Sequence, residues 1–509
     1  MADYVFGANL LEILTTGMYQ FSQVIFREYI QNSCDAIDKA VTLGILKPDK
    51  GEINIWLDKD KRLIDIEDNG AGIAADKFES TLQSIAQSGK QIDTEKGFRG
   101  IGRLCGLAYC RELVFSTTAK GEDLISTMRI DSQKLRSRFY GEKKYTAQEV
   151  LDEVITVEKK ISADARQKHW FKVELIDINA ENKTLLDEAF IRDYLSFVAP
   201  VEYQNTFYFD KKIHDYADSL NFEINEYRVN LNGKQLAKKY KTNFKTSNGS
   251  DEIFDLSFQD FRDEADRLIA WLWVGLSKFK GVINQKVETD DYKMRSIRLR
   301  KGNIQIGEAD ALQKLFKEER GIHYFIGEVF AVSKDLIPNS QRDYFIENRT
   351  LRIFEKALAD YFTNLHKVYY QASAVNSALR VVENLNTAQE NFSSQMFVSK
   401  NHRDEAQEKL DALRIRAEAS SRKIERQRRE AEAKPEEILS RVANNILENS
   451  NRVVRPALPL PSIKPAPRIF SKLKCDERKL VLKILDIIRE NTDAATFETL
   501  QRKIVECVG

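Results

Sequence analysis

The sequence contains few of the residues that build metal centres and disulfide frameworks. Its 509 residues include only five cysteines and five histidines. No two cysteines form a CxxC pair, and no histidine cluster accompanies them. We therefore expect neither a zinc site nor a disulfide framework, and the reducing cytoplasm is the predicted location.

The sequence also has no excess of either charge and no long apolar run. The 79 basic and 78 acidic residues give a formal net charge of +1, so no overall field attracts nucleic acid or an anionic membrane. The N-terminal segment carries polar residues before any long apolar run, so no signal peptide is expected. No stretch of 18 apolar residues occurs, so no membrane span is expected. The length and a hydrophobic content of 42% predict a globular chain of two or three domains.

Residues 24–39, VIFREYIQNSCDAIDK, are the segment around which the other motifs are organised. Apolar residues recur there at helical spacing, which puts Glu28, Asn32 and Asp35 on one face of a helix. An acid, an amide and an acid suit magnesium-nucleotide chemistry, because Asn offers a neutral oxygen to a hard cation and Glu can deprotonate water. Taken alone, the same stripe is also typical of a solvated helix face.

A β-hairpin is predicted next, with strands EINIWL and RLIDIED. The second strand ends at Asp68, in the sequence DNGAGI, where a carboxylate can accept a hydrogen bond from an exocyclic amine. Gly70 and Gly72 allow a sharp turn and the close approach of a flat ligand. Gly70-x-Gly72-x-x-Ala75 also resembles a dinucleotide fingerprint, but that fingerprint closes the first strand of a parallel βαβ unit, whereas here a helix and a hairpin come first.

More glycines follow a helix predicted at residues 74–87. The sequence SGK at residues 88–90 begins a polar segment that ends in GFRGIG at residues 97–102, ahead of an apolar helix predicted at 103–110. Glycines that free backbone N–H groups at a helix start make a phosphate cradle, and the segment between Gly89 and Gly102 is typical of a mobile lid. No GxxxxGK[ST] sequence occurs, so this is not a Walker-type cradle.

These three motifs, in this order and spacing, resemble the nucleotide motifs of the GHKL ATPases, which include gyrase B, the ninety-kilodalton heat-shock chaperone, histidine kinases and MutL. The resemblance is closest to the heat-shock chaperone, in FREYIQNSCDAIDK and SIAQSGK. It implies a Bergerat-type α/β sandwich that holds ATP and Mg²⁺ under a lid, with Glu28 as the general base, Asn32 as the Mg²⁺ ligand and Asp68 as the acceptor of the adenine amine. It also implies nucleotide-binding positions at Asp35, Gly70, Gly72, Ser88, Lys90, Gly97, Gly100 and Gly102.

The sequence departs from the family before the last strand of this domain. The family usually has Gly-Thr there, and the Thr hydroxyl serves a water bound to adenine. Here the segment reads RQKHW at residues 166–170. Either His169 replaces the hydroxyl or the alignment shifts, so no site role is assigned to His169.

A second, mixed α/β domain is predicted beyond Glu188, with strands near residues 207–209, 227–231, 268–276 and 296–306. In it, LIPNSQRDY at residues 336–344 resembles the catalytic loop of the chaperone's middle domain, where an Arg reaches the γ-phosphate. Arg342 is the candidate, because a permanently charged fork of donors suits phosphoryl charge. Alternatively, Arg342 is a surface residue that only forms an ion pair. Lys334 is a second candidate for the contact with the γ-phosphate, because other GHKL members use a lysine there.

The last third of the chain is predicted to be helical. Residues 350–448 contain no glycine and are rich in helix-forming residues, and Pro435 should break the helix near its end. Coiled-coil spacing is seen at Leu410, Leu413, Ala417 and Ile424. Residues 455–467 hold five of the nine prolines and read as a basic linker. The helical hairpin predicted at residues 476–508 is too small to stand alone, so it should pack on a partner subunit or on the body of the protein.

We therefore predict an α+β chain of five parts. They are a GHKL ATP-binding domain (1–187), a transducer-like α/β middle domain (188–370), a long helical or coiled-coil segment (371–450), a proline-rich basic linker (451–470) and a helical hairpin (471–509).

The predicted function is that of an ATPase acting as a homodimeric, chaperone-like clamp on a protein client, in which ATP closes the lid and Arg342 completes the site. An ATP-gated nucleic-acid clamp of the MutL, topoisomerase or MORC type is the alternative. It would explain the coil and the basic linker, but not the neutral charge. A regulatory module in stress or antiviral defence also stays open. A histidine kinase is disfavoured, because those proteins place the ATPase domain last and lack a base equivalent to Glu28.

Overall fold

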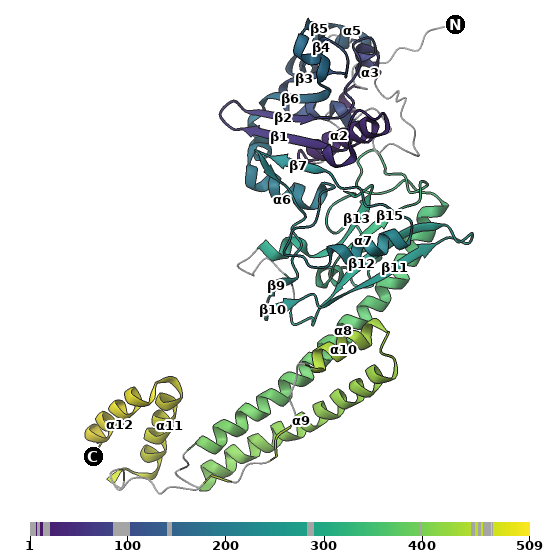
Figure 1. Cartoon of the computed structure of the whole chain (residues 1–509). Helices are drawn as coiled ribbons and strands as arrows, with labels where there is room; N and C mark the ends of the chain where they lie inside the picture. Colours follow the sequence, from purple (N-terminus) through teal and green to yellow (C-terminus); the bar gives the residue numbers. More distant parts are fainter. Residues whose placement is uncertain are drawn as a thin grey trace. The chain divides into compact units, whose positions relative to one another are not determined.

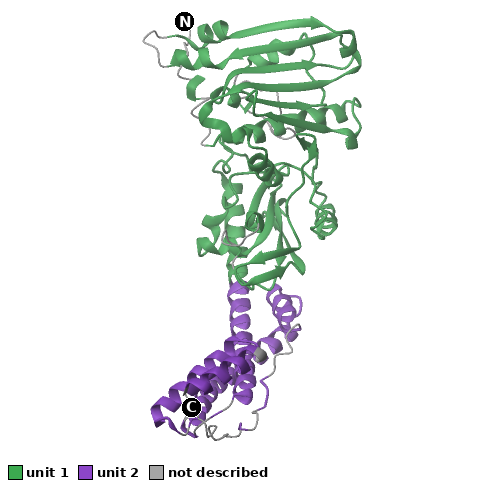
Figure 2. Cartoon of the chain, turned by 90° about the vertical axis from the view of Figure 1, so that its left-hand side faces the viewer, with its two compact units in different colours: residues 1–366 green, residues 367–509 purple. Residues whose placement is uncertain are grey.

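The structure is a computed structural model that describes most of the chain. The described residues are 7, 11–13, 21–84, 102–139, 145–281, 283, 290–395, 397, 400–448, 454–456, 460–461, 470 and 472–508. They form two compact units, residues 1–366 and residues 367–509 (Figure 2). Within the described part of the chain, no helix is both long enough and apolar enough to cross a membrane.

An eight-stranded sheet with the order β5-β4-β3-β6-β2-β1-β7-β8 organises the first half of unit 1 (Figure 1). Its strands are β1 (Glu52–Asp58), β2 (Leu63–Asp68), β3 (Cys110–Thr118), β4 (Leu124–Asp131), β5 (Ile155–Ile161), β6 (Trp170–Ile178), β7 (Arg228–Leu231) and β8 (Lys234–Gln235). β1 and β2 pair antiparallel, with Ile55 opposite Ile66, which confirms the predicted hairpin. β7 lies on the other side of β1 and runs parallel to it.

Helices pack on this sheet and bury its apolar side chains. They are α2 (Val24–Thr42), α3 (Phe78–Gln83), α4 (Ser132–Phe139), α5 (Ala147–Val154) and α6 (Glu188–Val198), with the 3₁₀-helices η1 (Pro48–Lys50), η2 (Gly102–Ala108), η3 (Ala163–Gln167) and η4 (Ala180–Leu186). Ile25 and Ile37 of α2 share one buried core with Ile66 of β2 and Leu195 of α6. Burial of each such side chain stabilises the fold by about 1.5–3 kcal/mol, so α2 is fixed against the sheet by its predicted apolar face.

Three predicted elements differ from the structure. The helix predicted at residues 103–110 is the 3₁₀-helix η2, and Cys110 already belongs to β3; Gly102 and Gly106 both lower helix propensity. The helix predicted from Ala74 begins only at Phe78, and residues 85–87 lie outside the described residues. Residues 207–209 form a turn before α7 (Asp210–Ser219), not a strand, because Phe207 packs into an aromatic cluster, 5.4 Å from Trp273.

A five-stranded sheet with the order β11-β12-β15-β13-β14 forms the second half of unit 1. Its strands are β11 (Asp255–Arg262), β12 (Leu268–Leu276), β13 (Ser296–Lys301), β14 (Ile304–Gln305) and β15 (Ile326–Ala331), beside the hairpin of β9 (Asn243–Thr246) and β10 (Gly249–Glu252) and the 3₁₀-helices η5 (Asp290–Met294), η6 (Gln313–Leu315) and η7 (Glu319–Tyr324). Trp271 of β12 stacks on Phe330 of β15, with ring centroids 4.4 Å apart. This aromatic core supports the strands from which the predicted catalytic loop extends.

Buried charges connect β13 to β15 in the same sheet. Glu328 is fully buried and is paired with Arg300 at 2.5 Å and with Lys238 at 3.5 Å. Burial alone would raise the pKa of Glu328, but the two cations lower it to about 2. Loss of one partner would leave a buried charge uncompensated, so the Arg300 pair holds β13 and β15 together.

The second unit is helical, as predicted. It contains the C-terminal part of α8 (Arg349–Ser394), together with α9 (Lys400–Ala433), α10 (Ile438–Glu448), α11 (Cys475–Asn491) and α12 (Ala494–Val508). Figure 1 shows α9 running back along α8. The expected seam residues Leu410, Ala417 and Ile424 are buried, and Pro435 lies in the break between α9 and α10.

Candidate active site

Helix α2 carries three of the predicted site residues one above another. Glu28 and Asp35 are buried, at 4% and 7% exposure, and Asn32 is half-buried. At 1.5 Å per residue, Glu28 and Asp35 are about 10 Å apart along the helix axis. Within the described part of the chain, the Asn32 side chain makes no hydrogen bond, so its amide oxygen is available to a ligand.

The Glu28 carboxylate lies between two arginines. Its Oε1 atom is 3.1 Å from Nε of Arg342 and 3.8 Å from Nε of Arg27. All three side chains are largely withdrawn from water, with exposures of 5%, 13% and 4%. Neither contact has hydrogen-bond geometry, so Oε1 accepts no hydrogen bond from the described residues. A buried oxygen without a donor is suited to hold a water molecule.

Arg342 reaches this carboxylate from a loop of the five-stranded half of unit 1. Besides its contact with Glu28, the guanidinium donates to Oε1 of Gln31. The reverse contact comes from Arg27, which donates to the carbonyl of Gln341 at 2.9 Å. The two halves of unit 1 therefore meet through reciprocal arginine contacts at Glu28.

The backbone of the loop holds Arg342 in an unusual conformation. Its φ is 55°, in the left-handed region that non-glycine residues rarely adopt. The loop is closed by a bridge between Pro338 and Phe345, and the Arg342 carbonyl accepts from the Gly307 N–H at 2.9 Å. A Cβ atom on Gly307 would lie 2.4 Å from the Asp343 carbonyl oxygen, so this close backbone contact requires glycine. These contacts compensate the strain at Arg342.

Lys334, the rival candidate, lies in a different environment. It is exposed, whereas the Arg342 side chain is only 13% exposed and contacts Glu28 directly. The geometry therefore favours Arg342 over Lys334 as the cation of the site.

Asp68 forms the second part of the site, at the end of β2. It is 3% exposed and accepts from the Gly70 N–H at 2.9 Å. Burial raises the pKa of Asp68 to about 7, an effect that the Gly70 N–H and the Ser33 hydroxyl partly oppose. Ser33 belongs to α2, so this carboxyl lies beside the helix that carries Glu28 and Asn32.

The glycines after Asp68 allow contacts that no other residue would. A Cβ atom on Gly70 would lie 2.6 Å from Ala36 of α2, and one on Gly72, whose φ is +64°, would lie 2.1 Å from the Thr118 carbonyl oxygen. The Thr117 hydroxyl accepts from the Ile73 N–H at 3.0 Å and donates to the Trp170 carbonyl at 2.7 Å. The turn is therefore tied to α2 on one side and to β3 and β6 on the other.

His169 lies at this turn. Its Nδ1 is 2.8 Å from the carbonyl oxygen of Gly70. Because a carbonyl only accepts, Nδ1 carries the proton, and in the neutral ring Nε2 is then an acceptor. His169 thus contacts the turn that follows Asp68.

Gly102 lies against Glu28 at the start of η2. A Cβ atom on Gly102 would lie 2.3 Å from Oε2 of Glu28, so an alanine there would displace the carboxylate. The Tyr29 hydroxyl donates to the Arg103 carbonyl and accepts from the Gly106 N–H, both at 3.1 Å, which anchors η2 on α2. The other predicted positions of this motif, Ser88, Lys90, Gly97 and Gly100, lie outside the described residues.

Several residues of the site were not identified from the sequence. Arg27 and Gln31 sit on the predicted helix beside Glu28, but only the fold shows that they contact Arg342. Thr117 lies near the end of β3, and nothing in its local sequence indicates that it meets Ile73. A buried polar residue at the end of a strand that faces a glycine turn is the signal that could have found it.

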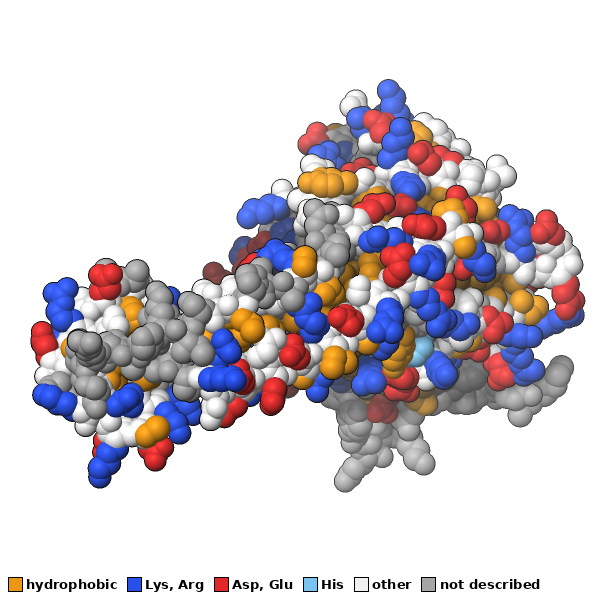
Figure 3. All heavy atoms as spheres, turned by 90° about the horizontal axis from the view of Figure 1, so that it is seen from below, with side chains coloured by type: hydrophobic (Ala, Val, Ile, Leu, Met, Phe, Trp, Pro, Cys, Tyr) orange, Lys and Arg blue, Asp and Glu red, His pale blue; other side chains and the backbone are white. Residues whose placement is uncertain are grey.

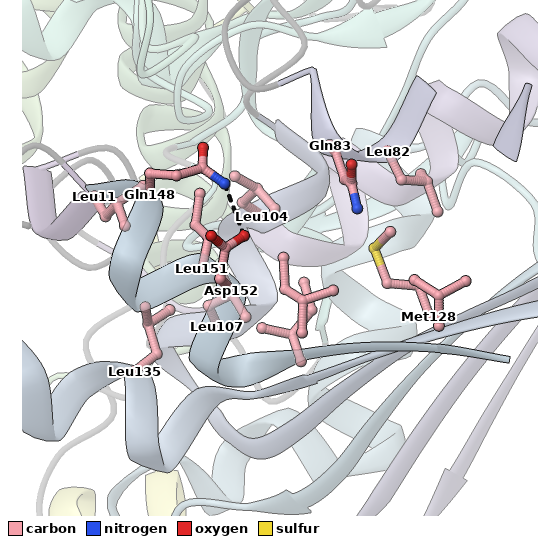
Figure 4. A pocket seen from close by; sticks show the side chains of 13 residues that line it. Leu11, Leu82, Gln83, Leu104, Leu107, Met128, Leu135, Gln148, Leu151 and Asp152 are labelled. Carbon is pink, nitrogen blue, oxygen red and sulfur yellow. Dashed lines mark hydrogen bonds between the residues drawn. The ribbon is translucent and has the colours of Figure 1, made fainter. Parts of the chain in front are cut away.

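The apolar cavity in Figure 4 is a separate feature of the same domain. Its volume is about 240 Å³, and its walls come mainly from Leu, Ile, Val and Met side chains of η2, β4, β5 and α5. At its edge Gln148 donates to Asp152 at 2.7 Å. None of the predicted site residues that the structure describes lines it, and an apolar wall does not compensate phosphate charge, so this cavity is not the candidate nucleotide site.

Asp210, His214 and Glu226 are the one group among the described residues whose spacing would allow metal binding. His214 Nε2 lies 3.2 Å from Asp210 and 3.5 Å from Glu226. Interaction of the ring with these two carboxylates, Asp210 first, raises the pKa of His214 to about 10. An imidazolium between two acids explains the group fully, so no metal is assigned there.

Comparison with known proteins agrees with this geometry. Residues 19–161 match the family described as histidine kinase-, DNA gyrase B-, and HSP90-like ATPase. The chaperone protein HtpG of Chromobacterium violaceum is 29% identical over 160 residues, which cover 28% of this chain and 24% of that protein. HtpG of Fusobacterium nucleatum is 36% identical over 94 residues (17% and 16% of the two chains), and an endoplasmin homolog of Arabidopsis thaliana is 33% identical over 97 residues (18% and 12%).

These matches cover a quarter or less of each relative's length, so they describe one domain. That domain contains α2, the turn after Asp68 and η2, which together carry the described residues of the three predicted motifs. The resemblance inferred from those motifs is confirmed over this range: residues 19–161 form a domain of the histidine kinase-, gyrase B- and HSP90-like ATPase family.

Proposed function

We propose that the protein is a Mg²⁺-dependent ATP hydrolase that works as an ATP-gated, dimeric clamp on a protein client, in the manner of a chaperone. The observation that carries the proposal is the contact between Glu28 of the ATPase domain and Arg342 of the following α/β half, at 3.1 Å. A site completed by a residue from another domain makes hydrolysis depend on how the two domains meet.

Each residue has a role that follows from its surroundings. Glu28 would take a proton from the attacking water, which its undonated Oε1 can hold. Arg342 would stabilise the charge that develops on the transferred phosphoryl group. Asp68 would accept the adenine amine while Gly72 leaves room for the base, and Gly102 would bring a backbone N–H group toward the phosphates.

The residues also fit a magnesium ion bound with the nucleotide. The Asn32 amide oxygen is a hard, neutral ligand without a hydrogen-bond partner among the described residues. When bound, the ion would neutralise phosphate charge and polarise the phosphoryl group. Asp35, one turn further along α2, would orient a bound water or the helix itself.

Replacing Arg342 tests the contact on which the proposal rests. Arg342→Ala should slow ATP turnover at least about tenfold with little loss of nucleotide affinity, because it removes a donor used mainly in the transition state. Arg342→Lys should rescue the rate only partly, since it keeps the charge but loses the planar fork. Steady-state hydrolysis and nucleotide titration by calorimetry measure the two effects.

Lys334→Ala is the matched control for this experiment. It removes a cation from the same loop region without touching Glu28, so turnover should stay at the wild-type level. A normal rate in Arg342→Ala together with a slow rate in Lys334→Ala would transfer the role to Lys334 and remove the observation that carries the proposal.

The raised pKa of Asp68 predicts that adenine recognition depends on pH. The ionised carboxylate is the better acceptor for the amine, and Asp68 ionises near pH 7. Adenosine affinity should therefore rise up to about tenfold from about pH 6 to about pH 8. Adenosine itself does not ionise between these pH values. A change in its affinity, measured by calorimetry at each pH, therefore reports the ionisation of a group on the protein.

Purine riboside, which lacks the exocyclic amine, is the control ligand for this titration. Its affinity should change little over the same pH range. An equal pH dependence for the two ligands would show that a group other than Asp68 is titrating.

A nucleic-acid clamp is the second candidate, and α9 is the feature that favours it. Among the described residues, its exposed Arg416, Arg422 and Arg428 have no carboxylate partner. On the face seen in Figure 3, however, blue and red side chains are mixed and no field of one sign appears. A salt-sensitive mobility shift with DNA or RNA would support this candidate, and no shift at low salt would remove it.

A further inference from the structure

Helix α11 has an apolar stripe that is exposed in the part of the chain that the structure describes. Leu480, Ile484 and Ile487 recur at the 4-3 spacing of a coiled-coil seam, and their exposures are 59%, 42% and 59%. The opposite side of α11 faces the rest of unit 2: Leu485 is buried at 5% exposure, and Arg489 donates to the Ser394 carbonyl at 3.5 Å. The stripe is therefore directed away from the contacts that hold α11 in its own unit.

Two opposite charges flank one edge of this stripe. Lys483 and Glu490 are both exposed, and neither has an ion-pair partner among the described residues. They lie seven residues apart, so they share one face of the helix but are about 10 Å apart along its axis. They are too far apart to pair with each other within one chain.

We infer that α11 pairs with α11 of a second copy of the chain, in the antiparallel direction. With a two-fold axis between Ile484 and Ile487, each Ile484 packs on Ile487 of the partner subunit. Each Lys483 then faces Glu490 of the partner subunit, twice by symmetry.

The charges also select this direction over the parallel one. In a parallel coiled coil, a residue that flanks the seam as Lys483 does faces the residue five positions further along the other helix. For Lys483 that residue is Ile488. Lys483 would then border an apolar side chain, and the position facing Glu490 would be residue 495, beyond the end of α11 at Asn491. Both directions pack the two isoleucines, and only the antiparallel pair also uses both charges.

This inference deepens the proposed function, because it supplies the dimer contact that the clamp requires. It does not depend on nucleotide, since α11 belongs to unit 2 and the ATP site to unit 1. The two proposals can therefore fail separately. A dimer that does not hydrolyse ATP removes the proposed function alone, and an active ATPase that does not pair through α11 removes this inference alone.

The test is the oligomeric state of the full chain without nucleotide, measured by analytical ultracentrifugation over a range of concentrations. Reductant is present throughout, because Cys475 and Cys507 are exposed. Wild-type protein should dimerise, and Ile484→Asp should weaken the dimer at least about a hundredfold. Ile415→Asp, which changes a 69% exposed isoleucine on α9, is the matched control and should dimerise like wild type.

A charge exchange tests the direction of pairing. Lys483→Glu and Glu490→Lys should each weaken the dimer about tenfold, because each places like charges opposite one another twice. The double variant, Lys483→Glu with Glu490→Lys, should return to the wild-type dissociation constant. A wild-type monomer, an unaffected Ile484→Asp dimer, or a double variant weaker than either single variant would each overturn the inference.

Discussion

Replacement of Glu28 should stop ATP turnover while leaving ATP bound. Glu28→Ala and Glu28→Gln remove the group proposed to take the proton from water, so the rate should fall by about 10²–10⁴-fold. Affinity for ATP should stay within a few-fold of wild type, since the proposed base contacts water more closely than nucleotide. Single-turnover hydrolysis and equilibrium titration measure the two quantities separately.

The glutamine variant is the sharper of the two, because of what surrounds Glu28. Alanine would leave Arg27 and Arg342 beside an empty space, whereas glutamine keeps the shape of the side chain and an oxygen atom next to both arginines. Asp38→Asn, on the same helix but hydrogen-bonded to Tyr227, controls for the loss of one negative charge. Turnover near the wild-type rate in Glu28→Gln would contradict the assignment of the base.

Replacement of Asp68 should abolish nucleotide binding. The carboxylate accepts from the Gly70 N–H and the Ser33 hydroxyl, so an amide in its place must present a donor to one of these groups or to the adenine amine. The variant loses a hydrogen bond to a charged group and places one donor against another. The affinity for ADP is therefore expected to fall at least about a hundredfold. Calorimetric titration of Asp68→Asn with ADP measures the change.

Asp65→Asn is the matched control for this substitution. Asp65 lies on the same strand, three residues earlier, and pairs with Lys172 at 2.6 Å, away from the glycine turn. It should retain wild-type affinity, and thermal unfolding of both variants shows whether the fold is kept. ADP affinity within about threefold of wild type in a folded Asp68→Asn protein would exclude the proposed orientation of the base.

The strands and helices of this fold could largely be predicted, because most of them have one buried face. β12 begins and ends at the expected residues, and β1 and β2 form the hairpin that was predicted. Residues 103–110 were misassigned because an apolar run does not distinguish a 3₁₀-helix from an α-helix. The pairing of β7 with β1 could not be predicted, since a parallel pair with more than 150 intervening residues has no local signal.

The candidate site divides in the same way. Glu28, Asn32 and Asp68 could be proposed from the sequence, because their motifs lie within one helix and at the end of one strand. Arg342 could be named from its loop, but its position against Glu28 depends on a left-handed backbone and on Gly307. The contact of His169 with Gly70 depends on sheet register, which spacing alone does not reveal.

The pairing of β7 with β1 has a practical consequence for handling pieces of this protein. A fragment that stops at residue 187 would lose α6 and β7, and with them the buried side chains of Ile191, Leu195 and Val229. It would also present the whole hydrogen-bonding edge of β1 to solvent, where strands of other molecules can add to it and precipitate the sample. A soluble nucleotide-binding fragment for crystallisation or screening should therefore extend at least through Gln235.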